Sequence, residues 1–124
     1  MESFEQGLGK HYLIELYSCK AGLLDDALLV EESLLKACEL SGATIINSLF
    51  HQFAPQGVSG VVVIAESHFS IHTWPENGYA ALDLFTCSPK LQVDLAIEMV
   101  EEAFECQKSE VKVVVRGEEC LVDF

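Results

Sequence analysis

The chain has 124 residues, half of them apolar, and its 20 acidic side chains against seven lysines and arginines give a net charge of −13. This length fits one domain, and no stretch approaches the roughly 20 uninterrupted apolar residues of a membrane span. The charge excludes nucleic acid and anionic membranes as partners, because both are bound through basic patches, but it is compatible with a cationic small molecule.

The first half of the chain predicts a strand, a helix and two more strands. Residues 10–18 are aromatic and branched, and they predict the first strand. Residues 24–40 carry apolar side chains at helical spacing, with Asp25 or Asp26 as the cap. Residues 43–53 predict a second strand, and the β-branched run 58–65 predicts a third that is buried on both faces.

The second half predicts two strands, a helix and a last strand. Residues 69–73 and 79–86 are strand-like and are joined by a turn that contains Asn77 and Gly78. Ser88 and Pro89 have the residue types of a helix cap and first helical position, and the apolar stripe of a core-facing helix follows them. Residues 110–116 predict the final strand.

This order predicts one α+β domain over residues 1–124. We expect a two-layer sandwich, a mainly antiparallel sheet of about six strands with two helices on one face. The other sheet face would be bare, and a second copy packed against it in a symmetric dimer is the expected cover. The N-terminal residues lack the basic region and apolar core of a signal peptide, so we expect a cytoplasmic protein.

Reactive side chains are concentrated in residues 65–76, immediately after the most apolar run of the chain. A metal site on His68 and His72 is disfavoured, because a strand would separate residues four apart by about 13 Å. A hydrolase with Ser67 as nucleophile is possible but lacks the Gly-x-Ser-x-Gly motif. Five cysteines without a Cys-x-x-Cys pair predict neither a disulfide framework nor a zinc site.

The segment from Gly57 to Cys87 carries a more specific signal. Its core reads Glu-Ser-His-Phe-Ser-Ile-His-Thr-Trp-Pro-Glu. This segment closely resembles the prokaryotic S-adenosylmethionine decarboxylase proenzymes, which make a pyruvoyl cofactor from an internal serine. The resemblance extends over roughly residues 8–105.

The resemblance implies that the chain cuts itself between Glu66 and Ser67, giving a beta chain of residues 1–66 and an alpha chain of residues 67–124. Ser67 would attack the carbonyl of Glu66, and elimination followed by hydrolysis would leave a pyruvoyl group. In the family the position of His72 is the processing base, and that of Ser59 assists. Sequence spacing alone does not choose between His72 and His68, and a bend or turn must bring His72 and Ser67 together.

For turnover, the resemblance implies that the pyruvoyl ketone forms a Schiff base with the substrate amine and accepts the electrons that decarboxylation releases. Cys87 would be the proton donor, a role that suits a thiol, which is mostly protonated at neutral pH. Phe53 would stack on adenine, and Glu76 would accept hydrogen bonds from the ribose hydroxyls. Trp74 lines the pocket or simply packs.

The predicted function is therefore conversion of S-adenosylmethionine to its decarboxylated form, the aminopropyl donor of spermidine biosynthesis. The family's sites lie between protomers, so a homodimer of cleaved protomers is expected, with two alpha and two beta chains. The first strand contributes there, which makes Glu15 and His11 weaker candidates. Two alternatives stay open: a pyruvoyl decarboxylase of arginine or ornithine, and a non-catalytic homologue that acts as a partner subunit.

Overall fold

The computed structural model describes residues 7–120 as one antiparallel sheet with helices on a single face. The six strands lie in the order β2-β3-β4-β5-β1-β6. The strands are β1 (Gly9–Tyr17), β2 (Ile45–Gln52), β3 (Val58–Ile64), β4 (Ser67–Trp74), β5 (Tyr79–Thr86) and β6 (Lys108–Arg116). The helices are α1 (Ala21–Leu24), α2 (Ala27–Leu40) and α3 (Val93–Ala103), and a 3₁₀ turn, η2, spans Pro75–Asn77.

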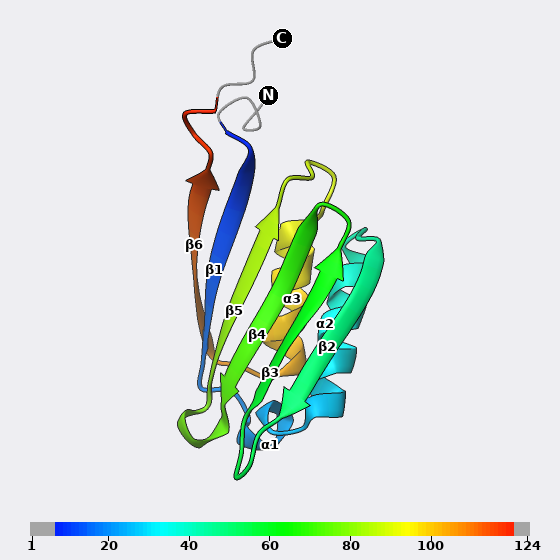
Figure 1. Ribbon diagram of the computed structural model, residues 1–124. Coiled ribbons are helices and arrows are strands. Elements are labelled where there is room, and N and C mark those ends of the chain that lie inside the picture. The colour runs from blue at the N-terminus through cyan, green and yellow to red at the C-terminus, as the bar shows by residue number, and fades with distance from the viewer. Residues whose placement is uncertain (1–6, 121–124) are drawn as a thin grey trace.

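The predicted α+β fold is confirmed. In Figure 1, α2 and α3 lie behind the sheet, and α2 packs against β2, β3 and α3. Apolar side chains on the helix-facing side of β1, β3, β4 and β5 form the core together with those of the helices. The largest fully buried side chains include Phe69, Phe104, Ile14, Leu16 and Leu82.

The predicted cap of the first helix is confirmed, but one predicted helix start was wrong. The Asp26 carboxylate accepts the backbone N–H of Leu29 (3.2 Å) and caps α2, which ends at Leu40 as predicted, and the short α1 precedes it. The helix α3 starts at Val93 rather than after Ser88. The Ser88 hydroxyl accepts the backbone N–H of Lys90 (3.2 Å), which makes a local turn instead of a helix cap.

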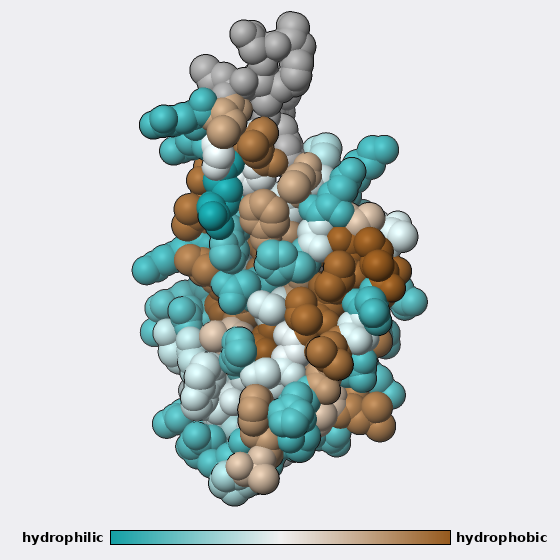
Figure 2. Space-filling view, in the orientation of Figure 1, coloured by the Kyte–Doolittle hydropathy of each residue, from teal (hydrophilic) through white to brown (hydrophobic). Residues whose placement is uncertain are grey.

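The prediction that residues 58–65 are buried on both faces was also wrong. Val58, Val62 and Ile64 point into the core, whereas Val63 is 41% exposed on the outer face. Apolar side chains are also exposed at Ile46 and Leu49 of the neighbouring β2. Figure 2 views the molecule from the side of this outer face, where apolar side chains gather over part of the surface. The helices leave this face uncovered, as predicted.

None of the helices in the described part of the chain is long and apolar enough to cross a membrane.

Candidate active site

Ser59 and His72 form a hydrogen-bonded pair on the outer face of the sheet. The two residues are opposite each other in the register of β3 and β4, and Ser59 Oγ lies 2.7 Å from His72 Nδ1. This end of the sheet is tied to α1 from behind: the Thr73 hydroxyl accepts the N–H of Val58 and donates to the carbonyl of Leu24. The pair is therefore held by a buried anchor on the opposite face.

Three other predicted site residues lie beside this pair. Phe53, Trp74 and Glu76 line one cavity of about 230 Å³ together with Ser59 and His72. The Phe53 ring is 47% exposed, so it is a surface aromatic and not a core residue. The cavity thus presents two exposed aromatic rings, an imidazole and a carboxylate, a set suited to a flat base attached to a polyhydroxyl group.

The first strand lies two strands away from this cavity. Glu15 accepts a hydrogen bond from the hydroxyl of Tyr79, whose ring lies 5.3 Å from that of Trp74 between centroids. Burial and this carboxylate raise the pKa of Tyr79, which keeps its hydroxyl protonated. His11 Nε2 lies 3.1 Å from an Asp83 carboxylate oxygen on the same face. Both weaker candidates are thus engaged with other side chains of the sheet.

The Glu66–Ser67 peptide occupies the opposite end of β4. Ala65 and Glu66 form the two-residue turn between β3 and β4, and Glu66 has a φ of 66°, a left-handed conformation that costs a non-glycine residue about 1–2 kcal/mol. The Glu66 carbonyl oxygen accepts the backbone N–H of Cys87 at 3.0 Å. The Ser67 hydroxyl donates to Oγ1 of Thr86 at 2.8 Å. Two consecutive residues thus hold the reacting groups at the predicted cleavage point: Thr86 holds the Ser67 hydroxyl, and Cys87 holds the Glu66 carbonyl.

Glu66 and Ser67 also line a second cavity of about 250 Å³, together with Ser88, Lys90 and Leu91. Cys87 is exposed next to them, at the end of β5. The structure therefore brings Glu66, Ser67 and Cys87 together as one group, which we call the cleavage group. We call Phe53, Ser59, His72, Trp74 and Glu76 the cavity group.

Within one chain the two groups do not meet. Ser67 and His72 are five residues apart on the uninterrupted β4, which separates them by about 16 Å. They also point to opposite faces, because Ser67 continues the row of buried Phe69 and Ile71 while His72 is exposed on the outer face. The bend expected between Ser67 and His72 is absent from β4.

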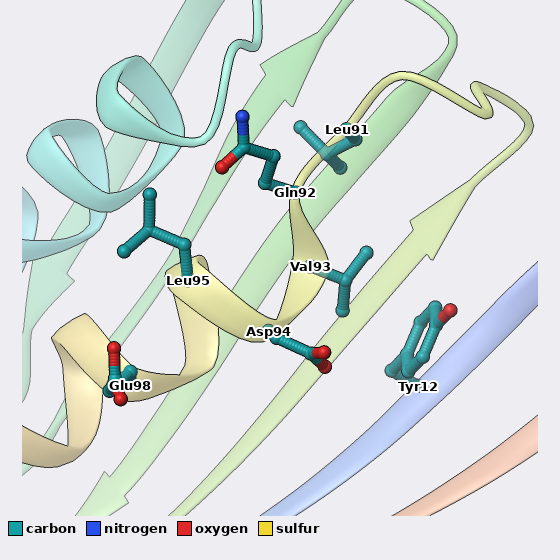
Figure 3. A pocket seen from close by; sticks show the side chains of 7 residues that line it. All are labelled: Tyr12, Leu91, Gln92, Val93, Asp94, Leu95 and Glu98. Carbon is teal, nitrogen blue, oxygen red and sulfur yellow. The ribbon is translucent and has the colours of Figure 1, made fainter.

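A cavity of about 550 Å³ lies elsewhere (Figure 3). It is lined by Tyr12 and by residues at the start of α3, including Asp94 and Glu98. Burial, and the charge of Asp94, raise the pKa of Tyr12. The cavity contains none of the predicted site residues, and size alone does not identify a site.

Thiol labelling of the folded protein should separate buried from exposed cysteines. Burial raises the pKa of Cys19 and of Cys38 to about 12. Because the thiolate is the reactive form, we expect neither residue to react with iodoacetamide at pH 8, whereas the exposed Cys120 is modified. Peptide mapping with and without denaturant measures this, and rapid modification of Cys38 in the native protein would contradict the buried position.

Thr86 is the residue at this site that the sequence analysis did not identify. Its side chain is 2% exposed and contacts Ser67 only because the two residues are paired in the register of β4 and β5. Nineteen residues separate them, and no local pattern in the sequence indicates such a contact.

Comparison with known proteins gives consistent matches. The family model described as S-adenosylmethionine decarboxylase matches residues 10–117. A protein of Thermotoga petrophila named S-adenosylmethionine decarboxylase proenzyme is 47% identical over 112 residues, which cover 90% of this chain and 86% of that protein. One of the same name from Pseudomonas paraeruginosa is 49% identical over 110 residues, 89% of this chain and 69% of its own length. The crystal structure of the adenosylmethionine decarboxylase from Aquifex aeolicus VF5 superimposes with a TM-score of 0.82 at 35% identity, over 90% of this chain and 92% of that one.

Proposed function

Because the chain belongs to the S-adenosylmethionine decarboxylase family, we propose that it decarboxylates S-adenosylmethionine with a pyruvoyl group made from its own Ser67. The product would be the aminopropyl donor of polyamine synthesis. The observation that carries the proposal is the fixed Glu66–Ser67 peptide. The residue before the cleavage point is held in a left-handed conformation, and its carbonyl accepts the backbone N–H of Cys87.

The residues at this turn fit the formation of such a group. An N–H that donates to the Glu66 carbonyl makes its carbon a better electrophile and stabilises the negative charge that an attack would place on the oxygen. Cleavage also releases Glu66 from its left-handed conformation. When formed, the pyruvoyl group supplies a ketone that can accept the electrons of a departing carboxylate.

We propose further that each active site is shared by two chains. The cavity group and the cleavage group lie at opposite ends of β4. A two-fold axis between two outer faces, perpendicular to the strands, would place the cavity group of one chain near the cleavage group of the other. The exposed Leu49 and Val63 on that face would be buried in the interface between the two chains. In this arrangement the homodimer contains two equivalent sites and, once cleaved, four polypeptides.

In this arrangement the two chains contribute different residues to each active site. His72, oriented by Ser59, would remove the α-hydrogen of the partner's Ser67 during cofactor formation. Phe53 and Glu76 would hold the adenine and the ribose, and Trp74 would close the cavity. Cys87, beside the cleavage point, would return a proton to the substrate carbon after carbon dioxide leaves.

Replacing Cys87 with alanine should lower turnover more than cleavage. The backbone N–H that contacts Glu66 is retained in this variant, while the proton donor is lost, so we expect chain cleavage within a few-fold of normal and decarboxylation lowered by about 100-fold. Fragment formation and carbon dioxide release are measured on the same samples. Cys120→Ala, at an exposed cysteine, is the control. Normal turnover by the Cys87 variant would remove Cys87 from this role.

Release of labelled carbon dioxide from S-adenosylmethionine, arginine and ornithine, measured in parallel, tests the substrate. We expect release from S-adenosylmethionine alone, with a higher KM after Phe53→Ala or Glu76→Gln. Release from arginine or ornithine instead would establish the amino-acid alternative. A fully folded chain that releases carbon dioxide from none of them would favour the non-catalytic alternative.

A further inference from the structure

Thr86 makes a hydrogen bond to the nucleophile of the proposed self-cleavage. Its Oγ1 accepts the Ser67 hydroxyl at 2.8 Å and the backbone N–H of Ser88 at 2.9 Å. A hydroxyl oxygen has two acceptor positions, so both are filled. The side chain is 2% exposed and belongs to the row of β5 residues that faces the helices. Thr86 is therefore a rigidly held acceptor of the hydrogen bond that the Ser67 hydroxyl donates.

The backbone next to Thr86 fixes the other reacting atom. The following residue, Cys87, donates its N–H to the Glu66 carbonyl at 3.0 Å. The end of β5 thus holds the hydroxyl of Ser67 and the carbonyl of Glu66 at the same time. Because the Ser67 hydroxyl directs its hydrogen toward Thr86, the lone pairs of its oxygen remain free for attack on a carbonyl that is already fixed in place.

From these contacts we infer that Thr86 is a positioning residue for the first step of self-cleavage, the transfer of the Glu66 acyl group from nitrogen to oxygen. This inference rests on the proposed function. In that step Ser67 Oγ bonds to the Glu66 carbonyl carbon, and the bond from that carbon to the Ser67 nitrogen breaks. The hydroxyl proton ends on the nitrogen, so no further reagent is consumed. Thr86 orients the hydroxyl for this step and has no part in the later elimination.

The test is the rate of chain cleavage in Thr86→Val, which keeps the side-chain volume but removes the hydroxyl. We expect cleavage to slow by about 100-fold, the size of effect that a misplaced reacting atom produces. Thr86→Ser keeps the acceptor and should cleave within about threefold of the unaltered chain, since an oriented hydroxyl is what the step requires. Ser41→Ala removes another buried hydroxyl, bonded to the Cys38 carbonyl at 3.0 Å, and should cleave normally.

Neutral hydroxylamine, which cuts esters, identifies the blocked step. Because Thr86 acts before the ester exists, the uncut Thr86→Val chain should stay intact in this reagent. If Thr86→Val accumulates an ester that hydroxylamine cuts, the block lies after acyl transfer and the inference is wrong. Thermal unfolding of each variant is recorded alongside; should Thr86→Val fail to fold, Thr86→Cys, with a weakly accepting thiol, takes its place under the same expectations.

Failure of this inference is distinguishable from failure of the proposed function. If the unaltered chain cleaves and Thr86→Val cleaves at the same rate, Thr86 has no positioning role although Ser67 remains the cofactor precursor. If the unaltered chain never cleaves while it is folded and active, the proposed function itself is wrong, and the inference about Thr86 is lost with it.

Discussion

Ser67→Ala is expected to remain a single chain of 13.7 kDa and to release no carbon dioxide from S-adenosylmethionine above background. Alanine has no hydroxyl to attack the Glu66 carbonyl, so neither the cut nor the ketone can form. The fold should be unaffected, because Ser67 makes one side-chain hydrogen bond, to Thr86, at the turn end of β4. Cleavage is followed by denaturing mass spectrometry, and turnover by carbon dioxide release.

Ser33→Ala is the matched control for this variant. The Ser33 hydroxyl donates to the Leu29 carbonyl within α2, far in the sequence from the cleavage point, and its loss should leave both cleavage and turnover intact. Steady turnover by Ser67→Ala would reject Ser67 as the source of the cofactor.

Mixing two inactive variants should restore activity if each site is shared between chains. His72→Ala lacks the proposed processing base, and Ser67→Ala lacks the cofactor precursor, so each alone should be uncut. In a mixed dimer, the intact Ser67 of one chain meets the intact His72 of the other. Half of randomly formed dimers are mixed and each has one complete site, so about a quarter of the normal number of sites should be recovered.

The mixture must be made by refolding or co-expression, so that the chains can exchange. Cleavage should occur only in the His72→Ala chain, because it alone retains Ser67, and mass spectrometry distinguishes the two chains. If refolded His72→Ala cleaves itself at the normal rate without the second variant, His72 is not the base. If the mixture remains uncut although mixed dimers form, each site lies within one chain.

The sheet could be predicted well because its strands are runs of aromatic and β-branched residues bounded by turn residues. Residues 79–86 were predicted as a strand and form β5 with the same bounds, with alternate residues buried. The wrong helix start arose where a polar side chain bonds locally. The hydroxyl of Ser88 closes a turn, and the same residue types serve helix caps and turns equally well.

The candidate site was predictable as a set of residues but not as an arrangement. The long motif around Ser67 supplied the residues through a resemblance. The division into two groups depends on the register of β4 with its neighbours, which places His72 beside Ser59 and Ser67 beside Thr86. Register is a pairing between distant segments, and a shift of one residue would reverse which face each side chain occupies. The expected bend between Ser67 and His72 was wrong for a simpler reason: β4 is one uninterrupted strand, on which residues five apart point to opposite faces.

The mass of the mature, active protein under denaturing conditions tests the central claim most directly. We predict two polypeptides, residues 1–66 and residues 67–124, the second with a keto group in place of its N-terminal amine that reacts with hydrazines. Active material that consists only of the uncut chain and carries no keto group would contradict the account.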